Sequence, residues 1–163
     1  TSKSPIFLSN IGSGLSSEQL KALSSGKFDR ILVVGGQRAV PDSVVKQIRN
    51  SSGSTVSRIS GATRYETSIT FAQWASEQGC LHMNNVVFAT GANFPDALVA
   101  GPFAGRNSAV LLLADPNGST ASFVKQYVKQ HGDVDNAYIV GGENAVSRNT
   151  ANGLADALDM LRP

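Results

Sequence analysis

The sequence contains few of the residues that build catalytic or metal sites. One cysteine, Cys80, and two histidines, His82 and His131, are present among 163 residues. A single cysteine excludes an internal disulfide bond and a zinc site made of several thiolates. No HExxH or GxSxG pattern occurs, and no Ser, His and Asp stand in a context that supports a hydrolase. We therefore expect a protein that is not an enzyme, with no catalytic residue, no metal and no cofactor.

Charge and long apolar runs are also scarce. Charged residues make up 16% of the sequence, against about 25% in a typical soluble domain. The 14 Lys and Arg and 12 Asp and Glu form no run of one sign, which argues against nucleic acid and against a polybasic membrane patch. No apolar run approaches the roughly 20 residues of a membrane span. The first residues lack the apolar core of a signal peptide, so we expect any export signal of the parent protein to have been removed.

The chain contains an internal similarity. Ile31-Leu-Val-Val-Gly-Gly-Gln-Arg-Ala-Val40 aligns without gaps with Ala137-Tyr-Ile-Val-Gly-Gly-Glu-Asn-Ala-Val146, at an offset of 106 residues. This offset predicts a repeat of about 106 residues and leaves about one and a half repeats in the chain. We expect residues 1–54 to be the C-terminal half of a preceding repeat and residues 55–163 to be one complete repeat, packed as one compact body. The chain thus resembles a piece of a longer array.

Short apolar runs alternate with amphipathic stretches along the whole length. This alternation is typical of strand–helix units in a parallel sheet, so the sequence predicts an α/β fold. The predicted strands lie near 5–9, 30–34, 55–59, 86–90, 109–113 and 136–140. The predicted helices lie near 16–24, 41–50, 64–78, 95–105, 119–131 and 144–160.

Each Gly-Gly pair follows a predicted strand and precedes a predicted helix. Residues without a Cβ allow positive φ and let backbone N–H groups face a ligand or a neighbouring chain, and a helix N-terminus favours anions. Gly35, Gly36, Gly141 and Gly142 are therefore candidate binding residues. Neither pair belongs to a G-x-G-x-x-G sequence or a P-loop. The alternative is a tight turn that allows close packing of helix and sheet.

Two arginines and an aspartate are predicted at the carboxyl ends of strands. Arg58 ends a strand, Arg64 begins a helix after a glycine turn, and Asp96 lies in the first turn of another helix. In open parallel sheets this edge is where ligands bind. Such arginines would attract a phosphate, a carboxylate or an acidic side chain of a partner. The alternative is an internal network in which Arg58 or Arg64 pairs with Asp96 or Glu66 and joins two loops.

These segments resemble the type 2 cell-wall-binding repeat of Gram-positive surface proteins. The resemblance rests on Arg58-Ile-Ser-Gly-Ala-Thr-Arg-Tyr-Glu-Thr67, on Ala89-Thr-Gly-Ala-Asn-Phe-Pro-Asp-Ala-Leu98 and on both Val-Gly-Gly-x-x-Ala-Val segments. It implies a three-layer, Rossmann-like or Toprim-like unit that commonly occurs as three tandem copies. The positions that match the family's motifs are Arg58, Arg64, Tyr65, Thr67, Phe94 and Asp96.

The function implied by the resemblance is non-covalent attachment to the cell wall. The expected partner is an anionic cell-wall polysaccharide or a teichoic-acid-like polymer, together with sister repeats in the parent chain or further copies in a homo-oligomer. The expected location is the cell wall or cell surface of a Gram-positive bacterium. Two alternatives from other classes are a protein-interaction or adhesion module that packs with sister repeats, and an accessory domain of a wall hydrolase.

Overall fold

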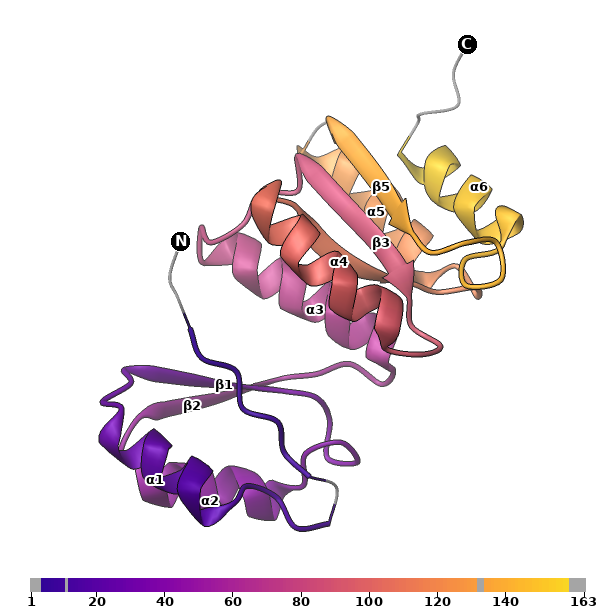
Figure 1. Cartoon of the computed structure of the whole chain (residues 1–163). Coiled ribbons are helices and arrows are strands. Elements are labelled where there is room, and N and C mark those ends of the chain that lie inside the picture. The colour runs from indigo at the N-terminus through magenta and orange to yellow at the C-terminus, as the bar shows by residue number, and fades with distance from the viewer. Residues whose placement is uncertain (1–3, 11, 132–133, 159–163) are drawn as a thin grey trace. The chain divides into compact units, whose positions relative to one another are not determined.

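The structure of the chain is a computed structural model that describes residues 4–10, 12–131 and 134–158 (Figure 1). The chain divides into two compact units between Ala62 and Thr63. We describe each unit by itself.

The first unit is a pair of parallel strands with two helices on one face. Its elements are α1 (Ser17–Ser25), β1 (Arg30–Val34), α2 (Asp42–Ser52) and β2 (Thr55–Ile59). β1 and β2 pair in parallel, with Val34 opposite Ile59. Leu23 of α1, Val44 and Ile48 of α2 and Val33 of β1 share one hydrophobic cluster. Both helices therefore cover the same side of β1.

Local sequence signals explain the helix ends of this unit. The Ser16 side chain accepts a hydrogen bond from the Gln19 backbone N–H, and the Gln19 side chain accepts one from the Ser16 N–H. This capping box satisfies two backbone donors that the first turn of a helix cannot pair internally. α2 ends at Gly53, which adopts the left-handed conformation with a φ of +64°.

The second unit has three parallel strands in the order β4-β3-β5. Its elements are α3 (Arg64–Glu77), β3 (Asn85–Thr90), α4 (Pro95–Arg106), β4 (Val110–Ala114), α5 (Ser119–His131), β5 (Asn136–Val140) and α6 (Arg148–Ala157). β3 is the central strand, and five of its six residues are buried, as expected for a strand covered on both faces.

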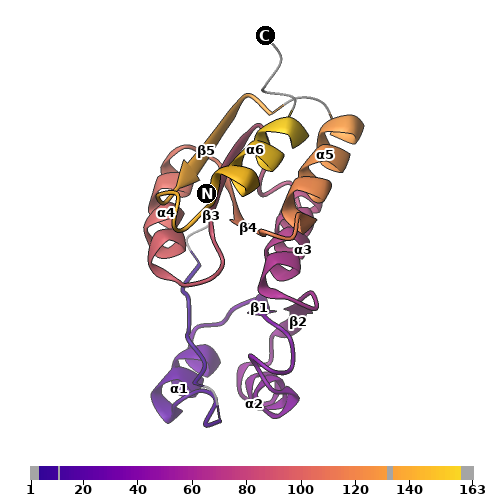
Figure 2. The same cartoon turned by 90° about the vertical axis from the view of Figure 1, so that its right-hand side faces the viewer.

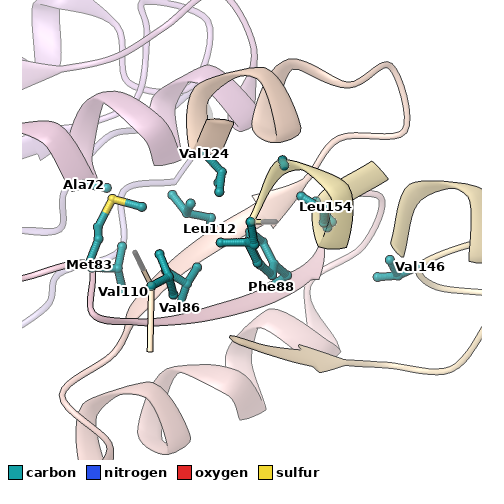
Figure 3. Close-up of a cluster of buried hydrophobic side chains, with 13 residues drawn as sticks. Ala72, Met83, Val86, Phe88, Val110, Leu112, Val124, Val146 and Leu154 are labelled. Carbon is teal, nitrogen blue, oxygen red and sulfur yellow. The ribbon is translucent and has the colours of Figure 1, made fainter. Parts of the chain in front are cut away.

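Helices cover both faces of this sheet (Figure 2). Val87 and Ala89 of β3 pack against Ala100 and Ala104 of α4 on one face. The alternate residues of β3 point to the other face and join side chains of α3, α5 and α6. Figure 3 shows this larger cluster, in which the labelled side chains are Ala72, Met83, Val86, Phe88, Val110, Leu112, Val124, Val146 and Leu154. The second unit is thus a three-layer α/β structure.

The predicted α/β fold with parallel strands is confirmed, but one predicted strand is wrong. Residues 5–9 form no strand, and Ile6 and Leu8 are exposed. The apolar run that aligns with them becomes β4, which pairs with β3. The first unit has no strand that pairs with residues 5–9 among the described residues. An apolar run without a neighbouring strand has no partner for its backbone groups, so it stays irregular.

The predicted helix at 144–160 begins later than expected. α6 starts at Arg148, because Ala145 and Val146 donate their N–H groups to the Gly142 carbonyl and form a turn instead. Residues 159 and 160 lie outside the described residues. The predicted repeat of 106 residues and the predicted boundary between 54 and 55 remain predictions.

In the part of the chain that the structure describes, no helix is both long enough and apolar enough to cross a membrane. The same residues contain no cluster of three or more His, Cys, Asp or Glu side chains that could hold a metal ion.

Candidate functional site

An open pocket of about 500 Å³ lies in the second unit, where β3 ends. Its walls are formed by Arg64 at the start of α3, by Phe94 at the start of α4 and by the loop between β3 and α4. The lining residues are Arg64, Gly91, Ala92, Asn93, Phe94, Ala97 and Leu113. The pocket therefore lies at the carboxyl ends of parallel strands, which is the edge where sheets of this kind bind ligands.

Arg64 is the positive group of the pocket. Its Nη1 donates to the Gly91 carbonyl over 2.6 Å, which fixes the guanidinium against the loop after β3. Among the described residues no carboxylate pairs with Arg64. A guanidinium has five N–H donors, so most of its donors remain for a ligand. The alternative from the sequence was an ion pair of Arg64 with Asp96 or Glu66. Within this unit, Arg64 bonds to the Gly91 carbonyl and forms neither ion pair.

Tyr65 and Thr67 have structural contacts. A Cβ built on Gly91 would lie 2.4 Å from Cε1 of the Tyr65 ring, so the ring occupies space that only a glycine leaves open. The Thr67 hydroxyl donates to the Thr63 carbonyl over 2.8 Å, within the first turn of α3. Neither residue lines the pocket. As ligand-binding residues, both remain predictions.

The N-terminus of α4 is a second feature that attracts anions, although the Asp96 carboxylate in its first turn opposes this attraction. Phe94 is the N-cap residue, and no side chain caps the first turn. Pro95 follows it and has no N–H group, which suits the first helical position. The N–H groups of this turn carry the positive end of the helix dipole. The Phe94 side chain is 75% exposed and offers a flat apolar surface beside Arg64.

Asp96 lies beside the second glycine turn and does not line the pocket. A Cβ built on Gly141 would lie 2.7 Å from Oδ2 of Asp96, so the carboxylate packs directly against that glycine. The turn adds a second carboxylate, Glu143, which pairs with Arg148 over 2.7 Å. Two carboxylates make this turn a poor place for an anion. The prediction that Gly141 and Gly142 bind a ligand is not tested by these contacts.

Arg58 belongs to the first unit. Its Nη1 donates to the Gly35 carbonyl over 2.6 Å, and its Nη2 pairs with Asp42 over 2.9 Å. The side chain is 20% exposed. The sequence left ligand binding and an internal network with Asp96 or Glu66 as alternatives for the arginines. In this unit the partner of Arg58 is Asp42, and ligand binding by Arg58 remains a prediction. Gly36 accepts hydrogen bonds from the N–H groups of Ala39 and Val40 and closes the turn that Arg58 contacts.

Sequence reasoning missed the carboxylate that follows β4. Burial raises the pKa of Asp115, but hydrogen bonds from Ser119 and from the backbone of Asn117 outweigh burial, so its pKa lies below the usual value. These bonds fix the loop between β4 and α5. Asn93 was also missed as a pocket residue, although it stands inside the motif that pointed to Phe94 and Asp96.

The sheet with helices on both faces and the open pocket with Arg64 are typical of a binding module of the α/β class. A family model described as "Cell wall binding domain 2 (CWB2)" matches residues 58–151, more than half of the chain. The chain therefore belongs to the CWB2 family and is a cell-wall-binding module. The resemblance noted in the sequence is confirmed, and the family's relatives support a location at the cell wall or outside the cell.

Two curated proteins of Bacillus subtilis (strain 168) are similar to the chain. N-acetylmuramoyl-L-alanine amidase LytC is 28% identical over 143 residues, which cover 86% of this chain and 27% of that protein. Amidase enhancer is 29% identical over 128 residues, which cover 78% of this chain and 17% of that protein. The chain thus spans about a quarter of the first relative and about a sixth of the second.

Two solved structures from Clostridium difficile have the same fold. Cwp6 matches with a TM-score of 0.74 and 22% identity, over 88% of this chain and 22% of that chain. Cwp8 matches with a TM-score of 0.68 and 24% identity, over 94% of this chain and 25% of that chain.

Proposed function

We propose that the pocket at Arg64 holds an anionic cell-wall polymer without cleaving it, at the surface of a Gram-positive bacterium. The observation that carries this proposal is a guanidinium without a carboxylate partner in the described residues, beside a helix N-terminus without a side-chain cap. The guanidinium favours a phosphate or a carboxylate, and the helix N-terminus adds to this attraction against the opposing charge of Asp96 in its first turn. Cell-wall polysaccharides and teichoic-acid-like polymers carry such groups.

The lining of the pocket supports binding without catalysis. Hydrolysis needs a nucleophile with a base, or a metal with an open position. The lining residues include no His, Cys, Ser, Asp or Glu. The pocket offers one cation, one amide side chain and apolar surface, which suits recognition of a charged sugar chain. A role as the accessory domain of a wall hydrolase is compatible with the partial matches to the amidase and the amidase enhancer, but these matches do not favour it over polymer binding.

Arg64→Gln should weaken binding to native cell-wall material by about tenfold or more, because a hydrogen bond to a charged group contributes about 1.5–3 kcal/mol. Cosedimentation with native and with polymer-stripped walls measures this effect. Binding should also weaken with added salt, since charges on an open surface are screened within about 10 Å at 0.1 M.

Arg106→Gln is the matched control for this variant. Arg106 lies in the last turn of α4, at the opposite end of the helix from the pocket, and is exposed. This variant loses the same charge and should bind like the parent chain. Equal pelleting with native and stripped walls, or equal loss of binding in both variants, would contradict the proposal. The melting temperature of each variant separates lost contact from lost folding.

A second proposed partner is another copy of the same unit, in a sister repeat or in a homo-oligomer. It is supported by an exposed apolar surface on α4 and β5, in which Phe103 and Tyr138 pack edge to face with ring centroids 5.1 Å apart. The exposed members of this α4–β5 surface are Phe94, Leu98, Val99, Phe103 and Tyr138. Contiguous apolar surface of this kind marks interaction sites on soluble proteins.

Leu98→Ser should reduce self-association of the chain, because Leu98 is 68% exposed on the α4–β5 surface and its loss removes apolar area from a contact. Sedimentation velocity over a hundredfold range of concentration measures the effect. Ile6→Ser changes an equally apolar residue of the first unit that is 87% exposed, and should leave the distribution unchanged. A chain that stays monomeric at every concentration would refute this partner.

A further inference from the structure

The two folded units differ in charge. Residues 1–62 contain eight Lys and Arg against three Asp and Glu, a net charge of +5. Residues 63–163 contain six Lys and Arg against nine Asp and Glu, a net charge of −3. The net charge of +2 for the whole chain is therefore the sum of a basic first unit and an acidic second unit. Such asymmetry indicates a partner of opposite charge for one part of a chain.

The cations of the first unit lie on its surface. Lys46 and Arg49 are three positions apart in α2, so they share one side of this helix. Of the three acidic residues, Glu18 and Asp42 lie in the first turns of α1 and α2, and Asp42 pairs with Arg58. The surface of the unit is therefore mainly positive. Its exposed cations among the described residues are Lys21, Lys27, Arg30, Arg38, Lys46 and Arg49.

The corresponding positions of the second unit are exposed as well. At the offset of 106 residues, β1 corresponds to β5 and α2 to α6. The residues at this offset from Arg30, Arg38 and Lys46 are Asn136, Asn144 and Asn152. All three asparagines are exposed, although helices cover both faces of their sheet. The exposure of the three cations therefore does not result from the smaller sheet of the first unit, which carries charges where the second unit carries neutral amides.

The spread of the cations favours a chain of anions over a single anion. Arg30 begins β1, and Arg38 follows its last residue, Val34, by four positions. The strand alone is about 17 Å long at 3.3–3.4 Å per residue, so one phosphate cannot contact both arginines. Lys46 and Arg49 add further charges along α2. A polymer with repeated phosphate or carboxylate groups can contact several of these cations at once and releases its bound counterions when it does so.

The aromatic residues of the first unit favour a polymer without bases. Phe7 and Phe28 are the only aromatic residues in positions 1–62, and both pack against the hydrophobic cluster of the unit. Proteins that bind single-stranded nucleic acid stack the bases on aromatic side chains. The first unit therefore combines positive charge with little surface for stacking, which suits a sugar or polyol chain that carries anionic groups.

We infer that the first unit is a second contact for the anionic wall polymer, in which the cations of β1, α2 and the turn between them attract successive phosphate or carboxylate groups. The inference rests on the proposed polymer as the ligand, but not on the pocket at Arg64. The pocket offers one guanidinium at a fixed position, whereas the first unit attracts the polymer through several exposed charges. Its contribution to affinity therefore falls steeply with added salt.

The test is the binding of a fluorescently labelled polyphosphate chain to the full protein chain. Titrations between about 0.05 and 0.2 M salt should show a steep fall in affinity. Inorganic phosphate at the same concentration of phosphate groups should compete far more weakly, because a single phosphate cannot contact several cations. Equal competition by inorganic phosphate, or an affinity that does not change with salt, would overturn the inference.

A triple variant removes three cations of the first unit. Arg38→Gln, Lys46→Gln and Arg49→Gln together should lower the affinity for polyphosphate at low salt by about tenfold or more. The slope of log affinity against log salt should also become shallower by about two, because each contact with a single-stranded polyanion accounts for about 0.7 of the slope. All three side chains are exposed, so the melting temperature should stay close to that of the parent chain.

A second triple variant removes the same charge from the second unit. Arg106→Gln, Lys125→Gln and Lys129→Gln replace exposed residues of α4 and α5, and together they should change the affinity for polyphosphate by less than about threefold. Equal losses in the two triple variants would mean that the net charge of the chain decides binding wherever the cations lie, and would overturn the inference.

The Arg64→Gln variant separates this inference from the proposed function. It should lose binding to native walls and keep most of its affinity for polyphosphate. If it binds walls like the parent chain, the proposal for the pocket fails, and the two triple variants still decide the role of the first unit. If it loses polyphosphate binding while the first triple variant keeps it, the polyanion lies at the pocket and the inference fails. Single-stranded DNA of equal charge that binds more than about tenfold tighter than polyphosphate would indicate recognition of bases and would also overturn it.

Discussion

Replacing Phe88 with alanine should lower the free energy of unfolding of the second unit by about 3–5 kcal/mol. Phe88 is 1% exposed and lies on the central strand, in the cluster that joins the sheet to α3, α5 and α6 (Figure 3). Its removal leaves a cavity among Leu112, Leu154 and their neighbours. Rigid strands and helices on all sides cannot collapse to fill it.

Urea unfolding followed by the fluorescence of Trp74 measures this loss, because Trp74 is the single tryptophan and lies in α3 of the same unit. Phe94→Ala is the control. It removes the same side chain from a site that is 75% exposed, so unfolding should change by less than about 0.5 kcal/mol. Similar losses for both variants would contradict the packing described here.

Gly141→Ala should destabilise the second unit by about 1–3 kcal/mol, the usual cost of a residue held in a sparsely populated region of φ and ψ. Gly141 has a φ of +122°, which residues with a Cβ rarely adopt. The added Cβ would also lie 2.7 Å from Oδ2 of Asp96 and 3.0 Å from Cβ of Ala145. Conformation and space therefore both require a glycine.

Gly142→Ala is the control in the same turn, because a Cβ on Gly142 would meet nothing within 4 Å. Its midpoint of urea unfolding should stay close to that of the parent chain. Adding Asp96→Ala to Gly141→Ala removes one close contact and should restore part of the loss, while the strain at φ remains. Equal stability of Gly141→Ala and Gly142→Ala would show that the turn adapts to either residue.

The strands β1 and β2, which sequence analysis predicted correctly, combine an apolar-rich sequence with a neighbouring strand to pair with. β1 and β2 are five-residue strands rich in apolar and β-branched residues that end near glycine turns, and their observed bounds are those predicted. Residues 5–9 have the same composition but no strand beside them among the described residues of their unit. Strand formation depends on a neighbour as well as on the run itself, and the neighbour lies far away in the sequence.

Local sequence signals also predicted only part of the candidate site. Motif positions pointed to Arg64 and Phe94, which line one pocket. The partner of Arg58 was missed, because an aspartate in the first turn of a helix is expected from the helix dipole alone, and nothing near Asp42 in the sequence marks its contact with β2. The contact of Asp96 with Gly141 joins positions far apart in the chain, so no local pattern could reveal it.

The limits of the family match and the limits of the folded units divide the chain differently at β2. The family match begins at Arg58, within β2, and ends at residue 151, within α6. The folded second unit begins at Thr63, and β2 pairs with β1 in the first. A recombinant fragment cut at the limits of the match would sever a strand and a helix, and would strip Arg58 of Gly35 and Asp42. Useful fragments of this chain should start and stop in the loops, not at the edges of the alignment.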